Sequence, residues 1–193
     1  TLTLTGADGL RTVGYRARDL TGNVEAVQAA AFALDNTAPA TNLAVSSPSF
    51  GSFVSSRTTL ALTGTDPVTG GVASGLDFTR YRLNGGAWLN APLGFSLVGA
   101  GTYLLEFQSQ DRVGILEVLR STTVLVDATP PASSLAVGVP KTMVLPGQGT
   151  GPEGLVIVSS RTPIEVFSTD PSVNNVASGL SRIVVSTGFG TFS

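Results

Sequence analysis

The chain has 193 residues, of which 42% are hydrophobic and only 12% charged, and its formal net charge is −2. The hydrophobic share is sufficient for a packed core, and the absence of basic clusters argues against nucleic acid or anionic lipid as a partner. Because the chain has no Cys and no His, it lacks thiol nucleophiles, histidine bases and the two commonest transition-metal ligands, so we expect no enzyme.

Strand patterns follow one another through the middle of the chain. From residue 43 onwards, apolar and polar positions alternate in short stretches separated by Gly, Pro and Asn, as in β-strands joined by tight turns. Asn84-Gly85 predicts a type I′ hairpin, because both central residues of that turn need a positive φ. The Ala-rich stretch 26–33 aligns with the β-branched VLRSTTVLV and is therefore predicted as a strand. The predicted strands are 43–46, 58–63, 76–83, 87–89, 95–98, 103–108 and 118–126.

The chain contains internal repeats. A segment that begins at Tyr15 aligns without a gap with one that begins at Phe107, at a constant offset of 92 positions: YRARDLTGNVEAVQAAAFALDNTAPATNLAV and FQSQDRVGILEVLRSTTVLVDATPPASSLAV. A second pair begins at Ser55 and Ser159, at an offset of 104: SSRTTLALTGTDPVTGGVASGL and SSRTPIEVFSTDPSVNNVASGL. The additional residues fall in PKTMVLPGQGTGPEG, which we interpret as an inserted surface loop.

These offsets predict three parts. Residues 1–36 would be the C-terminal half of a domain, 37–127 a complete domain, and 128–193 the N-terminal half of another. About 90 residues suit a seven-stranded sandwich. Joining the end of the chain to its start gives GTFSTLTLTGADGLRTVGYRARD, which resembles the missing middle of a domain. We therefore expect head-to-tail partnership between neighbouring copies, either as periods of a longer repeating chain or filament, or through domain-swapped half-units.

The pattern Y-x-A-x-D-x-x-G-N-x-E, followed by D-x-x-x-P, resembles bacterial immunoglobulin-like repeats, which are similar in layout to fibronectin type III modules. The second copy departs from the pattern at Ser109 and Ile115. The resemblance implies tandem immunoglobulin-like β-sandwich domains in a long extracellular or cell-surface protein. Such domains serve as spacers, adhesin stalks or filament units, and also as accessory domains of secreted enzymes. In the first copy the pattern is carried by Tyr15, Ala17, Asp19, Gly22, Asn23, Glu25, Asp35 and Pro39.

Four aspartates are candidate calcium ligands. Asp66 and Asp170 each end a predicted strand before a D-P-x-x-x-x-x-A-S-G loop, and Asp35 or Asp127 could add carboxylate ligands across the linker. Ca²⁺ prefers several carboxylate and carbonyl oxygens. The alternative is that each aspartate caps a turn through its own backbone. No other cofactor is expected.

Two further pairs of acidic residues have structural interpretations. Asp19 and Asp111 stand three residues before a Gly and predict turns. Glu25 and Glu117 open the last strand of each copy, where an outward charge would discourage edge pairing.

Aromatic residues near the predicted hairpin suggest a second kind of ligand. Trp88 and Tyr81, together with Phe78, could stack on a sugar ring; alternatively, Trp88 packs on Leu83 across the hairpin. No catalytic residues can be assigned, and the longest mostly apolar stretch, 24–34, is too short and too polar to span a bilayer.

Overall fold

The computed structural model describes residues 1–144, 154–187 and 190–192, and all of its regular elements are strands, which confirms the predicted all-β class. The chain folds as two compact units, Thr1–Val126 and Asp127–Ser193. Within the described ranges, no helix is long and apolar enough to cross a membrane. The strands are β1 (Gly9–Tyr15), β2 (Gln28–Leu34), β3 (Ala40–Val45), β4 (Ser49–Phe50), β5 (Phe53–Val54), β6 (Leu60–Thr65), β7 (Leu76–Leu83), β8 (Leu89–Asn90), β9 (Gly101–Asp111), β10 (Arg120–Val126), β11 (Ala132–Val137), β12 (Lys141–Met143), β13 (Val156–Val158), β14 (Ile164–Thr169), β15 (Val185–Thr187) and β16 (Gly190–Phe192).

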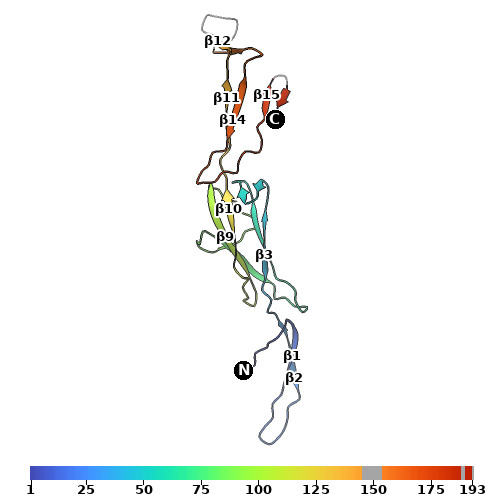
Figure 1. The fold of residues 1–193 in the computed structure, drawn as a ribbon. Coiled ribbons are helices and arrows are strands. Elements are labelled where there is room, and N and C mark those ends of the chain that lie inside the picture. Colours follow the sequence, from blue (N-terminus) through green and yellow to red (C-terminus); the bar gives the residue numbers. More distant parts are fainter. Residues whose placement is uncertain (145–153, 188–189, 193) are drawn as a thin grey trace. The chain divides into compact units, whose positions relative to one another are not determined.

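The first unit contains two sheets that enclose a core. A six-stranded sheet has the order β4-β5-β10-β9-β7-β8, and the antiparallel β3–β6 pair contacts it through β6 on β7 and β3 on β9 (Figure 1). All pairings in the larger sheet are antiparallel except that of β10 with β5, which is parallel. Burial of apolar side chains between the two sheets is the main stabilising term for this layout. The core comprises Val54, Leu60, Leu62, Tyr81, Leu97, Leu105, Phe107, Val124 and Val126.

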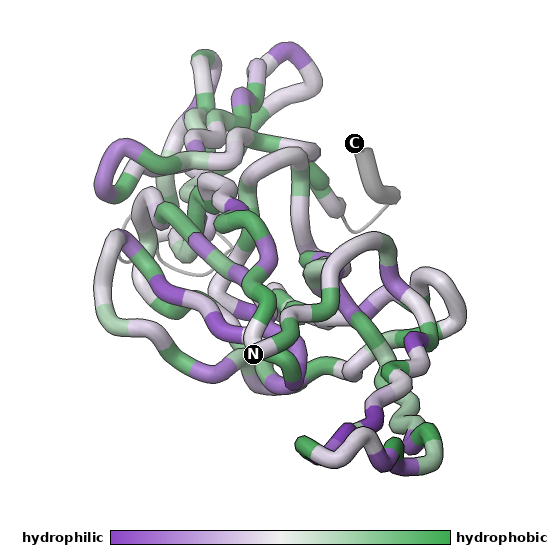
Figure 2. Tube along the Cα trace, turned by 90° about the horizontal axis from the view of Figure 1, so that it is seen from below, coloured by the Kyte–Doolittle hydropathy of each residue, from purple (hydrophilic) through white to green (hydrophobic). Residues whose placement is uncertain are grey.

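The alternation in the sequence determines which side chains reach this core. Leu60 and Leu62 are 0% and 6% exposed, as predicted for one face of β6, and hydrophobic and hydrophilic positions alternate along much of the trace in Figure 2. The predicted hairpin is confirmed: Asn84 and Gly85 have φ values of 51° and 70°. The Asn84 side chain also accepts a hydrogen bond from the Leu104 amide at 2.8 Å, which ties the turn to β9.

The strand assignments in this unit differ from the prediction at residues 95–98 and 49–54. Residues 95–98 form no strand; they make a single bridge, Phe95 to Leu60, while the Phe95 ring stacks on Tyr81 at 4.4 Å and Leu97 enters the core. Pro92 and Gly94 precede the stretch and Gly99 follows it, which limits ladder pairing there. The short strands β4 and β5 were not predicted. Pairing of β5 with β10, which is distant in the sequence, depends on tertiary contacts.

Glu117 is buried instead of facing outward as predicted. It is 9% exposed, and its carboxylate accepts hydrogen bonds from the Thr41 amide at 2.9 Å, the Ser109 amide at 3.1 Å and the Thr41 hydroxyl. Arg120 lies 3.9 Å from the same carboxylate. Glu117 therefore fastens the start of β3 to the end of β9.

The β1–β2 hairpin has the same register as β9–β10. Gly9 pairs with Leu34, and Gly101 pairs with Val126, which are the positions 92 residues further on. The turn after each first strand is also shared. Asp19 accepts from the amides two and four residues later, and so does Asp111, which confirms the predicted turn role of both.

The second unit repeats the strand pairing of the first. β11 pairs with β14 in the register that β3 has with β6, so that Ala132 faces Thr169 as Ala40 faces Thr65. β12 pairs with β13, and β15 with β16. Most of the predicted loop insertion falls on residues 145–153, outside the described residues. The division of the chain at 36/37 and 127/128 into half, complete and half domains stays a prediction.

Candidate metal centre

Three carboxylates meet where β2 ends and the next strands begin. Asp35 directly follows β2, Asp66 directly follows β6, and Asp111 is the last residue of β9. One carboxylate oxygen from each lies within 4.8 Å of the other two, and among the described residues this is the only group of three metal-ligating side chains. Sheet packing creates the cluster, because it brings the end of β6, in one sheet, close to the end of β9, in the other.

Backbone amides orient the first two carboxylates. Asp35 accepts from the Thr37 amide at 3.2 Å and, through its other oxygen, from the Ser74 amide at 2.6 Å. Asp66 accepts from the Gly75 amide at 2.6 Å. Gly75 has a φ of 87°, which glycine adopts readily and which lets two successive amides face the carboxylates. The carboxylates of Asp35 and Asp66 thus accept hydrogen bonds from backbone amides, as the turn-capping interpretation predicted.

These hydrogen bonds leave some buried oxygens of the cluster without a partner. Asp111 is fully buried, and its Oδ1 accepts from the amides of Val113 at 3.1 Å and Ile115 at 2.7 Å. Its Oδ2 is buried without a hydrogen-bond partner, as are Oδ1 of Asp66 and Oγ of Ser74. No other buried side-chain nitrogen or oxygen among the described residues lacks a partner. Buried oxygens of this kind are costly unless a ligand satisfies them.

The electrostatics of the cluster also favour a cation. The ion pairs in the described part of the chain are Arg82–Glu106 and Arg120–Glu117, so no arginine or lysine there forms an ion pair with the three carboxylates. Burial raises the pKa of Asp35, but hydrogen bonding from Ser74 and the Thr37 amide outweighs it, so the net pKa is below the ordinary value. Asp35 therefore stays ionised at neutral pH. Convergent carboxylate oxygens are ligands that Ca²⁺ prefers.

The sequence anticipated two of the three members. Asp35 and Asp66 were predicted as ligands, and the structure brings them together, whereas Asp111 was interpreted as a turn residue alone. Its turn uses only Oδ1, and the free Oδ2 becomes relevant only because β9 ends beside β6. No local sequence signal distinguishes this position from an ordinary turn aspartate.

Asp127 and Asp170, the other predicted ligands, make matching contacts in the second unit. Asp127 accepts from the amides of Thr129 at 3.1 Å and Ser178 at 2.7 Å, and Asp170 accepts from the Gly179 amide at 2.6 Å. Burial raises the pKa of Asp127, but hydrogen bonds led by those from Ser178 outweigh it, so that the net shift is downward. No described third carboxylate joins these two.

The aromatic candidates do not form one exposed platform. Tyr81 is 9% exposed and belongs to the core, so its ring is not presented to solvent. Two guanidinium groups lie over the Trp88 ring, those of Arg80 at 4.6 Å and Arg82 at 4.7 Å from the ring centroid. Arg82 in turn donates to Glu106 at 2.8 Å. These cation–π contacts would compete with a sugar for stacking on the same ring.

Comparison of this chain with protein-family models, with curated proteins and with solved structures found no match.

Proposed function

We propose that this chain is a structural segment of a long extracellular or cell-surface protein of repeated immunoglobulin-like units. It acts as a spacer or stalk, and Ca²⁺ bound by Asp35, Asp66 and Asp111 stiffens the joint before the sandwich. The observation that carries the proposal is the position of Asp35. It ends one strand pair while its two carboxylate oxygens accept from the linker and from the Ser74 loop of the following sandwich.

A cation at this point would connect three elements at once. Asp35 belongs to the joint, Asp66 to the end of β6 and Asp111 to the end of β9, so one bound ion restrains the linker against both sheets. A spacer benefits from this restraint, because a free Thr37–Pro39 linker would let successive units pivot. Extracellular modules bind Ca²⁺ with dissociation constants of roughly 10⁻⁴–10⁻³ M, which matches the millimolar calcium outside cells.

Further contacts support a fixed joint. The Asp8 carboxylate accepts from the Asn36 amide at 2.7 Å and from the Thr37 hydroxyl. The main-chain oxygen of Asp8 also lies so close to Gly70 that a Cβ there would overlap it. The hairpin, the linker and the loop after Asp66 therefore touch directly, which is the arrangement expected of a stiff spacer.

The test is calcium titration of the whole chain by calorimetry, with MgCl₂ as the competing salt, together with ¹⁵N relaxation of the β1–β2 amides. We expect one saturable calcium event at the Asp35 cluster, and slower independent motion of the hairpin when calcium is present. Asp66→Asn should remove that event. Asp77→Asn, at an exposed position of β7, is the matched control and should leave it unchanged.

Absence of calcium binding up to about 10 mM would contradict the cation part of the proposal. Binding that leaves the relaxation of the hairpin amides unchanged would contradict the stiffening role. Binding that persists in Asp66→Asn would place the ion elsewhere.

A further inference from the structure

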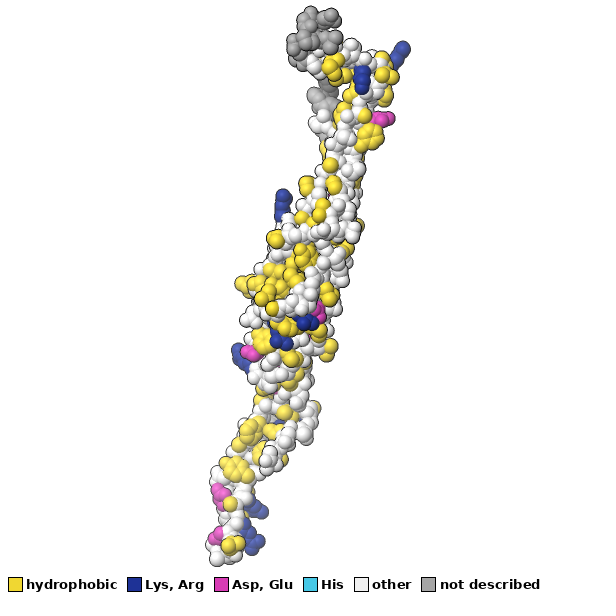
Figure 3. All heavy atoms as spheres, turned by 90° about the vertical axis from the view of Figure 1, so that its left-hand side faces the viewer, with side chains coloured by type: hydrophobic (Ala, Val, Ile, Leu, Met, Phe, Trp, Pro, Cys, Tyr) yellow, Lys and Arg dark blue, Asp and Glu magenta, His cyan; other side chains and the backbone are white. Residues whose placement is uncertain are grey.

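The β1–β2 hairpin and the second unit each expose an apolar face that is buried in the matching part of the first unit. In β9–β10, Phe107 and Val124 are 4% and 5% exposed, whereas their counterparts 92 residues earlier, Tyr15 and Phe32, are 56% and 47% exposed. On the face shown in Figure 3, hydrophobic side chains lie open to solvent, beside some basic and acidic groups. The apolar side of β1–β2 is therefore that of a core strand pair with no sheet opposite it.

The second unit has the complementary deficit. Ile164 and Val158 are 55% and 42% exposed, whereas their counterparts 104 residues earlier, Leu60 and Val54, are 0% and 6% exposed. In the first unit, β9 and β10 contribute to the core that covers those counterparts. The apolar face of the β1–β2 hairpin and the apolar face of the second unit could therefore cover one another.

Strand edges show the same complementarity. In the first unit, β10 pairs in parallel with β5, but β13, the counterpart of β5, pairs only with β12 among the described strands. β9 pairs with β7 along its length, whereas residues 180–184, the counterpart of the start of β7, form no strand. A strand pair is therefore missing between these two edges.

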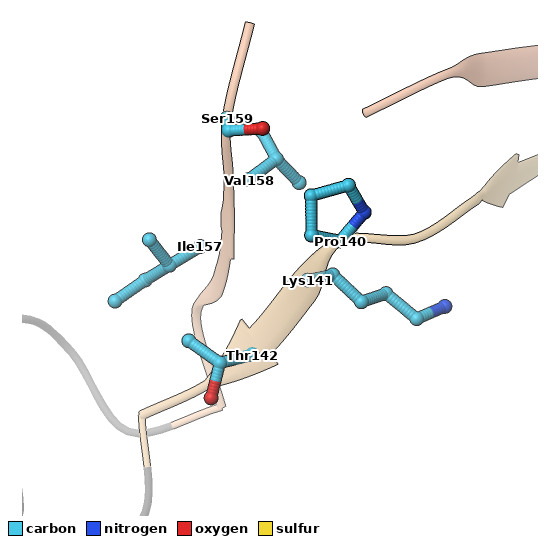
Figure 4. Close-up of a pocket in the computed structure, with 6 residues that line it drawn as sticks. All are labelled: Pro140, Lys141, Thr142, Ile157, Val158 and Ser159. Carbon is cyan, nitrogen blue, oxygen red and sulfur yellow. The ribbon is translucent and has the colours of Figure 1, made fainter. Parts of the chain in front are cut away.

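An open cavity of about 320 Å³ is lined by residues of the paired strands β12 and β13. In Figure 4, Val158 and Pro140 face one another across it, while Lys141 points away. In the first unit, the counterparts of Ile157 and Val158 are paired by Leu125 and Val126 of β10. The edge of β13 that faces away from β12 is therefore where a strand equivalent to β10 would dock.

Polar groups match as well. Glu117 accepts from the amide of Thr41, whose counterpart in the second unit is Ser133. Glu25, the counterpart of Glu117, is exposed, and among the described residues it accepts only from the Ala17 amide, at 3.1 Å. An incoming hairpin would bring this carboxylate to the Ser133 amide.

We infer that the Asp127–Ser193 unit binds the β1–β2 hairpin of a second copy of this chain, which inserts between β13 and residues 182–187. The registers follow from the first unit: Leu34 of the hairpin lies beside Val158 in parallel, Tyr15 faces Val185 antiparallel, and Glu25 accepts from Ser133. The inserted strands satisfy both open edges and bury both apolar faces.

The interface is heterologous, since a hairpin meets a different surface on its partner. Each copy carries one hairpin and one acceptor unit, so every association leaves a free hairpin and a free acceptor, and chains grow or close into rings. This inference extends the proposed spacer role and does not require the cation, because no cluster residue takes part.

The experiment uses the whole chain, in chelator, with size-exclusion chromatography and light scattering. Wild type should form a concentration-dependent series of oligomers. Phe32→Asp places a charge on the hairpin face, and Ile164→Asp places one on the acceptor face, so each variant alone should be monomeric. Both variants should still fold, because both positions are exposed in the unassembled chain. An equimolar mixture of the two variants should form a 1:1 dimer and nothing larger, because one intact hairpin and one intact acceptor remain.

The matched control is Leu93→Asp, at a fully exposed position of the first unit, which should oligomerise like wild type. A wild-type chain that stays monomeric up to about 1 mM would overturn the inference. So would oligomers that survive either disabling variant, or a mixture of the variants that remains monomeric. Because this experiment is done in chelator, its failure would leave the calcium proposal standing. A failure of the calcium titration would likewise leave the oligomer inference standing.

Discussion

Asp66 and Asp111 each place one buried carboxylate oxygen, without a hydrogen-bond partner, in the same three-carboxylate cluster. The two residues end strands of different sheets, β6 and β9, so their approach is a product of sandwich packing. Their remaining oxygens accept from backbone amides and are held in place. We expect three carboxylates held this close together to repel one another in the absence of a cation.

Asp111→Asn tests the sign of that repulsion. The asparagine oxygen can still accept from the Val113 and Ile115 amides, while the new amide group can donate toward Asp66. In chelator we expect the free energy of unfolding to rise by about 1 kcal/mol. In calcium, the wild type should gain stability and the variant should not. Thermal denaturation of both proteins in chelator and in about 5 mM calcium checks this. A variant that is destabilised in chelator would contradict the account.

Glu117→Ala should destabilise the first unit by about 2–4 kcal/mol, because it leaves the buried amides of Thr41 and Ser109 without acceptors. Glu117→Gln keeps one acceptor oxygen and should cost less. The exposed counterpart gives the control: Glu25→Ala should change the stability of dilute, monomeric chain by no more than about 0.5 kcal/mol. Urea denaturation measures all three, and equal losses at both glutamates would contradict the prediction.

Leu60→Ala and Ile164→Ala compare the same strand position in two environments. Leu60 is fully buried, so its truncation should cost about 2–5 kcal/mol. Ile164 is 55% exposed, so in dilute chain its truncation should cost less than about 1 kcal/mol. Denaturant titration of the two variants, monitored by NMR signals from each unit, distinguishes them. A large loss at Ile164 in monomeric chain would show that this face is already covered.

Gly64→Ala should destabilise the sandwich by about 1–3 kcal/mol. A Cβ at Gly64 would overlap the hydroxyls of Thr79 and Ser109, which hydrogen bond to each other at 2.8 Å. Gly14→Ala is the control, since a Cβ there meets its nearest atom, on Val27, at 3.7 Å. Thermal denaturation should show a clear loss for the first variant and little change for the second.

The Asp19 turn should resist acid. Hydrogen bonds from the side chains of Asn23 and Thr21 are the two largest causes that lower the pKa of Asp19 from 3.8 to about 2. Because the folded pKa lies below the unfolded one, the stabilisation of the turn is present above about pH 4. It is lost as the pH falls through about 2.

A ¹³C titration of the Asp19 carboxyl carbon checks the value. Asn23→Ala should move the pKa back toward 3.8, without unfolding the hairpin, because the matching turn at Asp111 has an isoleucine at that position. A wild-type titration near 3.8 would contradict the prediction.

Much of the fold follows from local pattern. Alternation in β6 and the Asn84-Gly85 turn predicted an all-β chain, and burial and φ values agree. In β9 the predicted alternation is not matched by burial, because residues 105–109 are all buried. The prediction was wrong where long-range contacts decide. Residues 95–98 became a loop anchored by a ring stack and by Leu97 in the core. Glu117 turned inward because Thr41 and Ser109 offer it buried donors.

The sequence by itself determined the strand character, the repeat offsets and two of the three cluster aspartates, because alternation, turn residues and loop chemistry are local. Only the tertiary structure decided that Asp111 joins Asp35 and Asp66, because the ends of β6 and β9 meet through sheet packing. It also decided which copies of a repeated face are buried: Leu60 is covered and Ile164 is exposed. Burial depends on what lies opposite a strand, and a strand's own residues do not specify that.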